Sequence, residues 1–327
     1  MPPLEEPLML QPLRDIVLSR SISDVAFVNE HELVVADVEC TLFTYDWRSG
    51  TATLRAHHSD VLRESAASAP VPLIQPLIAV EPGGSVVVSP HDGMLVSKET
   101  DGLWRVLTET TGMSTPAFSF SPTGDYFAMA AEGELRVWNM RDPSQYTVDD
   151  VDAFTWAPST TAIVVLLGDG RLQALDARSG TVVHEVGRVE YGGQARGTLG
   201  TNDLAILGSG ILVVALEGWS IDFWNLSPFS LVKRHSVVEA AESVFTSEEG
   251  DWFVTESDHM VRFWDSETLT EVCEPLGKPA RQWQGIRFSP SGELMVTIGM
   301  PEMEGTGEFA FANENVRATV WRVIRGQ

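Results

Sequence analysis

Two stretches of the chain, Phe118–Asn139 and Val244–Asp265, align with each other without a gap. Each reads as a strand, a turn at Gly-Asp, a second strand, an acidic turn and a third strand that ends on Trp-Asn or Trp-Asp. One such unit cannot bury both of its faces alone, so repeated units must stack on their neighbours. The repeat therefore predicts an all-β chain built from similar sheets.

The same frame recurs elsewhere, and we count seven units. Two further copies are clear, at Val25–Asp46 and Leu204–Asn225, and three are looser, at Leu77–Glu99, Phe154–Asp176 and from Ile286 onward. A fourth alternating segment follows each unit except the seventh. It begins near the following residues: Thr51, Leu103, Gln145, Thr181, Ser230 and Leu269.

A strand near the N-terminus supplies the fourth segment that the seventh unit lacks. We expect Leu13–Leu18 to pair with Val316–Val323 and so close a ring, which leaves only short, protected edges. This predicts a single domain over residues 1–327, with residues 1–12 as an N-terminal tail and residues 13–18 as the closing strand.

Short motifs inside the units resemble those of the WD40 family of β-propellers. Its Trp-Asp signature stands at Trp264-Asp265, with near forms at Trp138-Asn139, Trp224-Asn225 and Tyr45-Asp46, and its Ser-Pro-x-Gly turn begins at Ser121 and Ser289. The bracing Asp of the family matches at Asp169 and Asp258, with Glu39 and Glu132 in its place in two other units, while its Gly-His pair is absent from the sequence. The resemblance covers nearly the whole chain and implies a divergent seven-bladed propeller of four-stranded antiparallel blades. It also implies that Trp138, Trp224, Trp264 and Trp321 lie in the core.

Composition fits a soluble protein, which we expect to be cytoplasmic. The first ten residues contain two acids and three prolines but no apolar stretch, and no apolar run approaches the roughly 18 residues of a membrane span. Cys40 and Cys273 fall in different units and read as small apolar side chains rather than as a disulfide.

The formal net charge of -24 opposes the phosphate backbone of nucleic acid, so we expect no direct nucleic-acid ligand. The charge favours basic partners, although plain solubility explains it equally well.

Three long insertions interrupt the units, at residues 56–76, 187–203 and 301–315. In a propeller the connection from a fourth strand to the next first strand lies on the same face as the connection from a second to a third strand. We call this face the top face. All three insertions are expected there, and the second contributes Tyr191 and Arg196 as binding candidates, because loops on a rigid scaffold often carry function.

Acidic residues precede the innermost strand in four units: Asp24, Asp152, Asp203 and Glu242. We expect these carboxylates to form an acidic collar around the mouth of the central channel. Such a collar would attract a Lys or Arg side chain, an amine or a hard cation. The alternative is that these side chains accept hydrogen bonds from turn amides where each strand begins.

Aromatic and histidine side chains complete the candidate site. Trp219 and Trp283 read as binding anchors, because aromatic side chains dominate interface hot spots. His91 lies in a turn on the same face, and with the His57-His58 loop it would offer metal ligands, but the spacing matches no ligand motif. We therefore assign no metal site and expect no cofactor.

The sequence contains none of the usual catalytic signatures, such as a nucleophile elbow or a phosphate-binding loop. The favoured interpretation is a binding or scaffold module that engages a peptide or protein, with basic groups, through the top face. The alternative is an enzyme of propeller type that acts on a small cationic or amine substrate, with collar carboxylates as acid and base.

Overall fold

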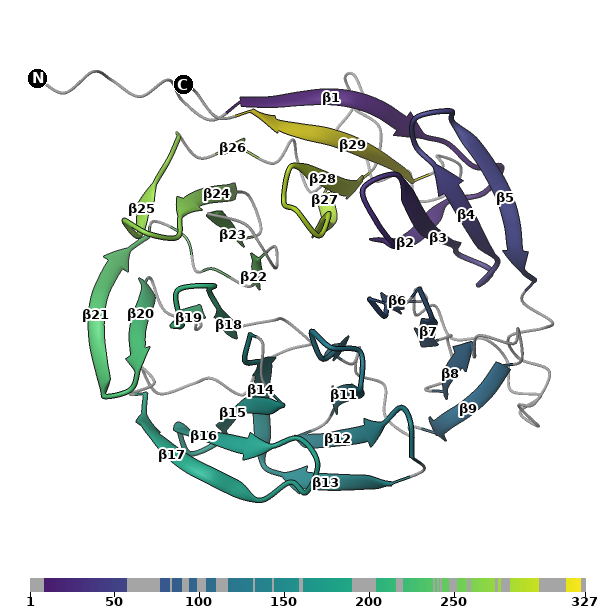
Figure 1. Ribbon diagram of the computed structural model, residues 1–327. Coiled ribbons are helices and arrows are strands. Elements are labelled where there is room, and N and C mark those ends of the chain that lie inside the picture. The colour runs from purple at the N-terminus through teal and green to yellow at the C-terminus, as the bar shows by residue number, and fades with distance from the viewer. Residues whose placement is uncertain are drawn as a thin grey trace, which may run out of the picture. The chain divides into compact units, whose positions relative to one another are not determined.

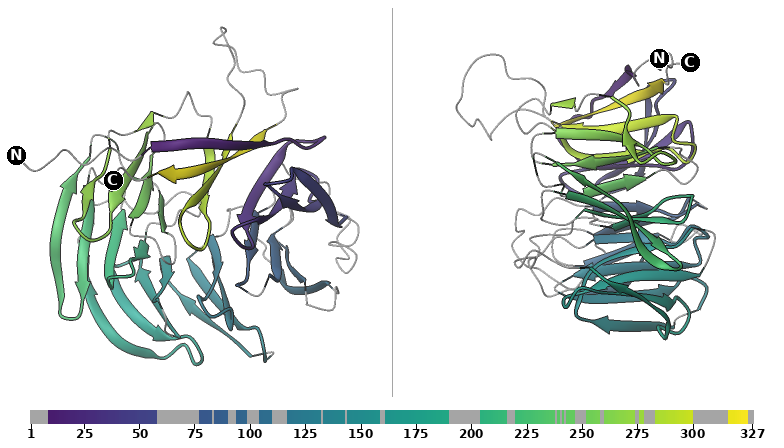
Figure 2. Two further views of the ribbon diagram at one scale, coloured as in Figure 1. Left: turned by 45° about the horizontal axis from the view of Figure 1, so that its top comes forward. Right: turned by 90° about the vertical axis from the view of Figure 1, so that its left-hand side faces the viewer.

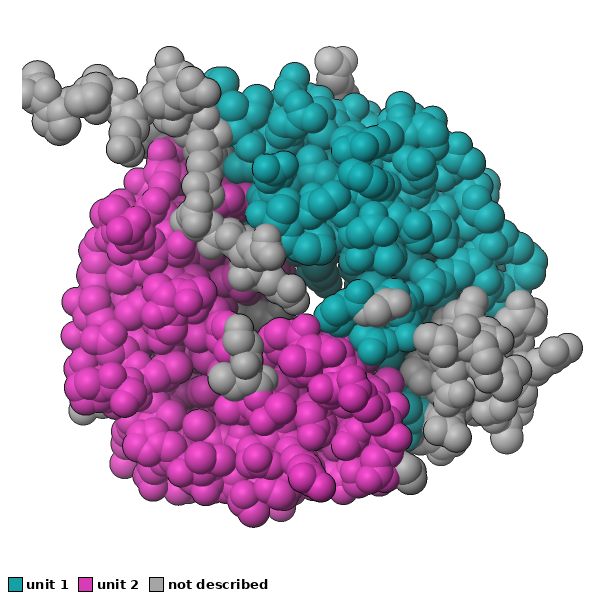
Figure 3. Space-filling view, in the orientation of Figure 1, with its two compact units in different colours: residues 1–113, 278–327 teal, residues 114–277 magenta. Residues whose placement is uncertain are grey.

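The computed structural model is all-β over the residues that it describes. These are residues 9–57, 77–82, 84–89, 94–98, 104–109, 117–131, 133–142, 144–158, 161–189, 204–215, 220–237, 239, 241, 243–246, 252–257, 260–273, 276–277, 283–299 and 316–324. They form seven antiparallel sheets, six with four strands and one with five (Figure 1). The chain divides into two compact units, drawn in separate colours in Figure 3. Unit 1 comprises residues 1–113 and 278–327, and unit 2 comprises residues 114–277.

Unit 1 contains three of these sheets. The first sheet consists of β2 (Ile22–Phe27), β3 (Glu32–Asp37), β4 (Leu42–Asp46) and β5 (Thr51–Ala56). The second consists of β6 (Leu77–Val80), β7 (Val86–Ser89), β8 (Met94–Lys98) and β9 (Trp104–Glu109). The third consists of β27 (Trp283–Phe288), β28 (Leu294–Gly299), β29 (Arg317–Ile324) and β1 (Met9–Ile16).

Unit 2 contains the other four sheets. Two of them are β10 (Ala117–Phe120), β11 (Tyr126–Ala131), β12 (Glu134–Asn139) and β13 (Gln145–Asp149), and then β14 (Val151–Trp156), β15 (Ala162–Leu167), β16 (Arg171–Asp176) and β17 (Val182–Arg188). The third is β18 (Leu204–Ile206), β19 (Ile211–Ala215), β20 (Ser220–Leu226) and β21 (Phe229–Ser236). The fourth is β22 (Ser243–Thr246), β23 (Trp252–Glu256), β24 (Met260–Asp265), β25 (Thr270–Glu271) and β26 (Leu276–Gly277).

The N-terminal strand pairs with the last strand, as the sequence predicts. β1 is antiparallel to β29, from Met9 opposite Ile324 to Ile16 opposite Ala318, and Figure 2 shows the two strands alongside each other. The bounds differ from the prediction, because the strand begins at Met9 rather than Leu13 and ends at Ile16. Ile16 is completely buried in the core between this sheet and the first sheet.

The fifth strand in the last sheet of unit 2 arises from a split outer strand. β25 pairs with Trp264 and Asp265 of β24, whereas β26 pairs with Met260 and Val261. β25 and β26 thus pair with opposite ends of β24. Six sheets thus match the predicted four-stranded blade, and this one departs from it.

Neighbouring sheets within each unit pack face to face through aliphatic and aromatic side chains. In unit 2, three apolar clusters join the four sheets in chain order, and two clusters do the same for unit 1. Successive side chains of a strand point to opposite faces of its sheet. Because each sheet is packed between neighbours, the inner strands bury apolar side chains on both faces. Cys40 is buried, which raises the pKa of its thiol to about 12, and neither Cys40 nor Cys273 forms a disulfide.

The Asp or Asn near the end of the third strand caps the turn into the fourth strand in four sheets. In each of four sheets its Oδ1 atom accepts hydrogen bonds from the backbone N–H groups two and three residues further on. The four residues are Asp46, Asn139, Asp176 and Asp265. Only a short side-chain acceptor is needed for this Asx turn, so Asn serves as well as Asp.

The four tryptophans of the third strands are not equally buried. Trp138 and Trp264 are buried as predicted, with exposed fractions of 6% and 0%, whereas Trp224 and Trp321 are only half-buried. The core assignment of Trp224 and Trp321 is therefore wrong in part. Trp224 stacks on Phe229 at 4.7 Å between ring centroids.

Hydrogen bonding of these indoles depends on one residue of the second strand. Trp264 donates to Thr255 Oγ1 and Trp321 to Thr297 Oγ1, each at 2.9 Å. Among the described residues, the buried Nε1 atoms of Trp138 and Trp224 have no hydrogen-bond partner. The repeat places Met129 and Ala215 where Thr255 stands, and neither side chain carries a hydroxyl group.

Candidate functional site

Only part of the predicted binding site lies within the described residues. Asp24 and Asp152 are described completely, and Trp283 is described as the first residue of β27 without its side chain. The others lie outside the described residues: His91, Tyr191, Arg196, Asp203, Trp219 and Glu242. The three long insertions also fall largely outside them.

Asp24 lies inside β2, not before it, and is 2% exposed. Its Oδ1 atom accepts a hydrogen bond from Val25 N at 2.9 Å, and its Oδ2 atom accepts one from Ile78 N at 2.9 Å. Arg287 Nη2 lies 3.5 Å from Oδ1. This single carboxylate therefore connects the innermost strands β2, β6 and β27 of unit 1.

The environment of Asp24 corrects the expectation that it stands open at a channel mouth. Burial raises the pKa of the Asp24 carboxyl above its ordinary value, and Arg287 and the two backbone N–H donors offset part of that effect. The cation that this carboxylate attracts belongs to the same chain. The structure thus supports the alternative that Asp24 satisfies backbone amides.

The raised pKa predicts how stability depends on pH. Because the folded state binds a proton to Asp24 more tightly than the unfolded state does, folding loses stability as the pH rises from about 4 through the folded-state pKa. Asp24→Asn should remove this contribution. Urea unfolding between pH 4 and pH 7 should show the wild-type free energy of unfolding falling relative to the variant, by at most about 1.4 kcal/mol per pH unit. A difference that rises with pH would contradict the assignment.

Asp152 occupies a different position from Asp24. The β14–β15 register shifts between Val151 and Ala153, so Asp152 is the extra residue of a bulge, and it is exposed. The equivalent bulge in the first sheet falls at Ser23, and Asp24 is the next, paired residue. The sequence alone does not show that Asp152 and Asp24 occupy different positions of the strand, because a bulge inserts one residue without a sequence signal.

Trp283 begins β27 and pairs with Gly299, and the register shifts again before Gly285. A bulge at the start of the innermost strand thus recurs in three sheets. Its extra residue is Ser23, Asp152 or Gln284.

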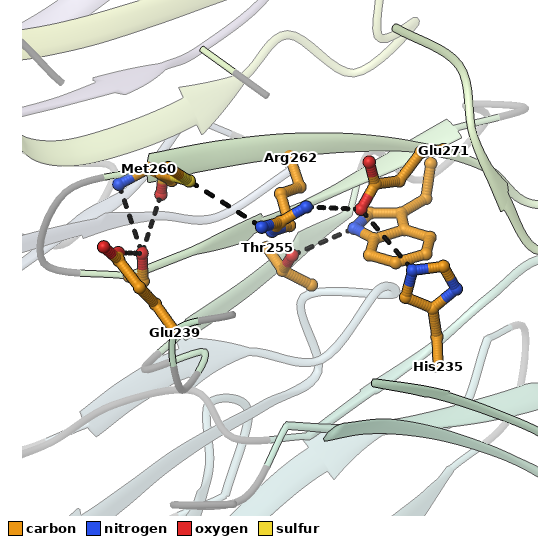
Figure 4. A network of polar contacts seen from close by, with 8 residues as sticks. His235, Glu239, Thr255, Met260, Arg262 and Glu271 are labelled. Atoms are coloured by element: carbon orange, nitrogen blue, oxygen red, sulfur yellow. Dashed lines mark hydrogen bonds and ion pairs between the residues drawn. The ribbon is translucent and has the colours of Figure 1, made fainter. Parts of the chain in front are cut away.

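A polar network that the sequence reasoning missed lies in the last sheet of unit 2 (Figure 4). Arg262 Nη1 lies 2.6 Å from Glu271 Oε1, and His235 Nε2, from β21 of the adjacent sheet, lies 3.6 Å from the same oxygen. The His235 ring meets Trp264 edge-on at 4.8 Å. The sequence contains a signal for this contact, because His235 lies upstream of the Trp264-Asp265 pair. Arg234 stands before His235, where the Gly-His pair of the WD40 family has Gly.

A second part of this network holds the connection between β23 and β24. Ser257 Oγ donates to Glu239 Oε2 at 2.8 Å and accepts from Met260 N at 3.1 Å. These residues, with Glu256 and Arg262, line a shallow hollow that has no room for a water molecule. The hollow lies at the end of the sheet where fourth-to-first and second-to-third connections meet.

The polar groups of this network form ion pairs and hydrogen bonds that hold the strands in place. Where the structure is described, no three His, Cys, Asp or Glu side chains gather closely enough to hold a metal ion. Nor does any helix within the described ranges have the length and hydropathy of a membrane span. The carboxylates and cations of the network pair with one another, which fixes the strand ends.

The fold is similar to that of solved β-propellers. The β-propeller domain of Cps50 (Swd1) from Myceliophteria thermophila matches with a TM-score of 0.66 and 15% sequence identity, over 97% of this chain and 100% of that domain. The WD40 repeats of RRP9 match with a TM-score of 0.65 and 17% identity, over 97% of this chain and 100% of theirs. No protein-family model and no curated protein sequence matches the chain. The protein thus has the fold of a WD40 β-propeller with four-stranded antiparallel blades.

Proposed function

We propose that this protein is a seven-bladed propeller that acts as a scaffold, binding a protein or peptide through the top face. The split outer strand of the last sheet in unit 2 supports the count of seven, because β25 and β26 together occupy the place of one fourth strand. The fold match over 97% of the chain supports a scaffold, since propellers present loops on a rigid frame. The two similar structures are described as a β-propeller domain and as WD40 repeats.

The partner of the top face is proposed to carry basic groups. The observation that carries this part is the exposed carboxylate of Asp152 on a bulge at the start of an innermost strand. A net charge of -24 adds long-range attraction for cations. Asp203 and Glu242 extend the same acidic group in the proposal, whereas Asp24 leaves it because its side chain is buried.

Substitutions at this acidic group should weaken binding of a protein partner recovered from native lysate and identified by mass spectrometry. Replacing Asp152 and Asp203 by Asn and Glu242 by Gln should raise the Kd about tenfold and reduce its dependence on salt. Isothermal titration at two salt concentrations would measure both quantities.

The matched control is Asp142→Asn, an exposed acid in the turn between β12 and β13, at the opposite end of its sheet. It should leave the Kd and its salt dependence unchanged. Equal affinity for the triple variant and the control would exclude an acidic top-face site. Recovery of a stoichiometric bound metabolite in place of a protein would favour the enzyme alternative.

A further inference from the structure

β13 differs from the outermost strands of the other four-stranded sheets in having no register shift. In the other five of these sheets the outermost strand carries an extra residue: β1, β5, β9, β17 and β21. β13 instead pairs with β12 residue for residue, from Gln145 opposite Trp138 to Asp149 opposite Glu134. Bulges, Pro and Lys are the usual devices that keep a sheet edge from pairing, and β13 contains none of them. Its edge is therefore regular.

The open edge of β13 presents the backbone groups of alternate residues. Asn139 N donates to the Ser144 carbonyl at 3.1 Å, so in the alternating antiparallel pattern the next pair, Trp138 with Gln145, is not hydrogen-bonded. Gln145, Thr147 and Asp149 thus direct their N–H and C=O groups away from β12. Within the part of the chain that the structure describes, β12 is the strand that pairs with β13, and Figure 1 shows β13 on the outer side of unit 2. The outward groups are arranged for β-strand addition.

The side chains of β13 alternate between two faces. Tyr146 and Val148 pack against the apolar core between the first two sheets of unit 2. Gln145, Thr147 and Asp149 are exposed on the other face. A strand added to the edge would place its own side chains beside these three, and such cross-strand neighbours stabilise a sheet when they are β-branched or of opposite charge.

The charges beside this edge favour a basic strand. Asp149 lies opposite Glu134, and Arg136 forms an ion pair with Glu134. Two carboxylates and one guanidinium leave a net negative charge on this part of the face. A Lys or Arg opposite Asp149 would form a favourable pair, whereas an acid there would be repelled. The net charge of -24 also opposes edge-to-edge pairing with a second copy of the chain.

We propose that β13 binds an extended peptide segment by antiparallel strand addition, with a Lys or Arg opposite Asp149 and a β-branched residue opposite Thr147. Backbone hydrogen bonds to Gln145, Thr147 and Asp149 supply the affinity, and the alternate side chains supply the selectivity. This site goes beyond the proposed top-face function, because it requires only the edge of one outer strand.

The test uses fluorescein-labelled peptides and the full chain. The basic peptide is Ser-Lys-Val-Thr-Val-Lys-Ser, and the acidic peptide has Glu in place of both Lys residues. Fluorescence polarisation should show the basic peptide binding at least about fivefold more tightly than the acidic one. Equal binding of the two would overturn the charge selection.

Backbone methylation of the basic peptide tests strand addition itself. N-methyl groups on the Lys and Thr residues block the amides that face β13, and should weaken binding at least about tenfold, because several hydrogen bonds are lost. N-methyl groups on the two Val residues block amides that face solvent, and should have a much smaller effect. Equal binding by the two methylated peptides would exclude strand addition.

Variants of the protein locate the site. Thr147→Pro removes one outward N–H group but no hydrogen bond to β12, a position where an edge strand tolerates Pro. It should weaken binding of the basic peptide at least about tenfold. Thr147→Val is the matched control, because it keeps the N–H group and a β-branched side chain, and should bind normally. Identical binding by these two variants would overturn the proposal.

Asp149→Lys provides a test that does not depend on the folding of the Pro variant. It should reverse the preference, so that the acidic peptide binds more tightly, and an unchanged preference would overturn the assignment of Asp149. The triple variant of Asp152, Asp203 and Glu242 should bind the basic peptide as the wild type does, which separates this site from the top-face site. Self-association of the wild type that Thr147→Pro abolishes, seen by sedimentation, would assign the edge to a second copy and overturn the peptide partner.

Discussion

Deletion of residues 1–20 is expected to lower the thermal stability of the protein by about 10 °C. The deletion removes β1, exposes the edge of β29 and uncovers the core around Ile16, which is completely buried. Loss of that apolar contact and of the strand pairing should cost roughly 3–5 kcal/mol, at about 2–4 °C for each kcal/mol in a domain of this size. Differential scanning calorimetry measures the midpoint directly.

The control for this deletion removes residues 1–8 only and keeps β1 from Met9 onward. Its midpoint should equal that of the intact chain. Unchanged thermal unfolding of the longer deletion would show that β1 does not contribute to the stability of the last sheet. Equal losses in both deletions would assign the effect to the first eight residues.

Trp264→Ala should destabilise the protein by roughly 3–5 kcal/mol, as large-to-small truncations in a packed core do. Trp264 is completely buried, stacks on Phe253 at 5.9 Å and 7° between ring planes, and lies in the cluster that joins two sheets of unit 2. Trp138→Ala should cost a similar amount, because this indole packs against Phe127 with 6% exposure. Urea unfolding at neutral pH would compare the variants.

Phenylalanine variants separate the hydrogen bond from the packing. Trp264→Phe leaves the buried hydroxyl of Thr255 without its indole donor, whereas Trp138→Phe removes an N–H group that has no partner among the described residues. The first variant should therefore lose about 1–2 kcal/mol more than the second. Equal losses would mean that the hydrogen bond of Trp264 contributes nothing measurable.

Much of the fold was predictable because the repeat fixes both strand period and turn chemistry. β10 to β12 and β22 to β24 begin at equivalent residues of the two aligned stretches, so the register read from the sequence is confirmed. Bulges were not predictable. An extra residue at Asp152 or Val183 changes which face a side chain reaches, and nothing in the local composition marks it.

The candidate site was predictable only in its residue types. Asp24 is acidic and stands near a strand start, but its role depends on Ile78 and Arg287, which are distant in sequence and meet it only through the fold. The inter-sheet contact of His235 with Glu271 has the same origin. Asp203, Glu242 and the other residues outside the described ranges remain predictions.

The register shifts along the outer strands have a consequence for solubility. A straight outer strand offers a continuous row of free backbone groups, on which a strand of another molecule can assemble into an aggregate. β1, β5, β9, β17 and β21 each carry a shift, which interrupts that row. On β17 and β21 the extra residue is itself an exposed valine. The shifts on β17 and β21 therefore interrupt the strand edge at the very residues whose apolar side chains are exposed.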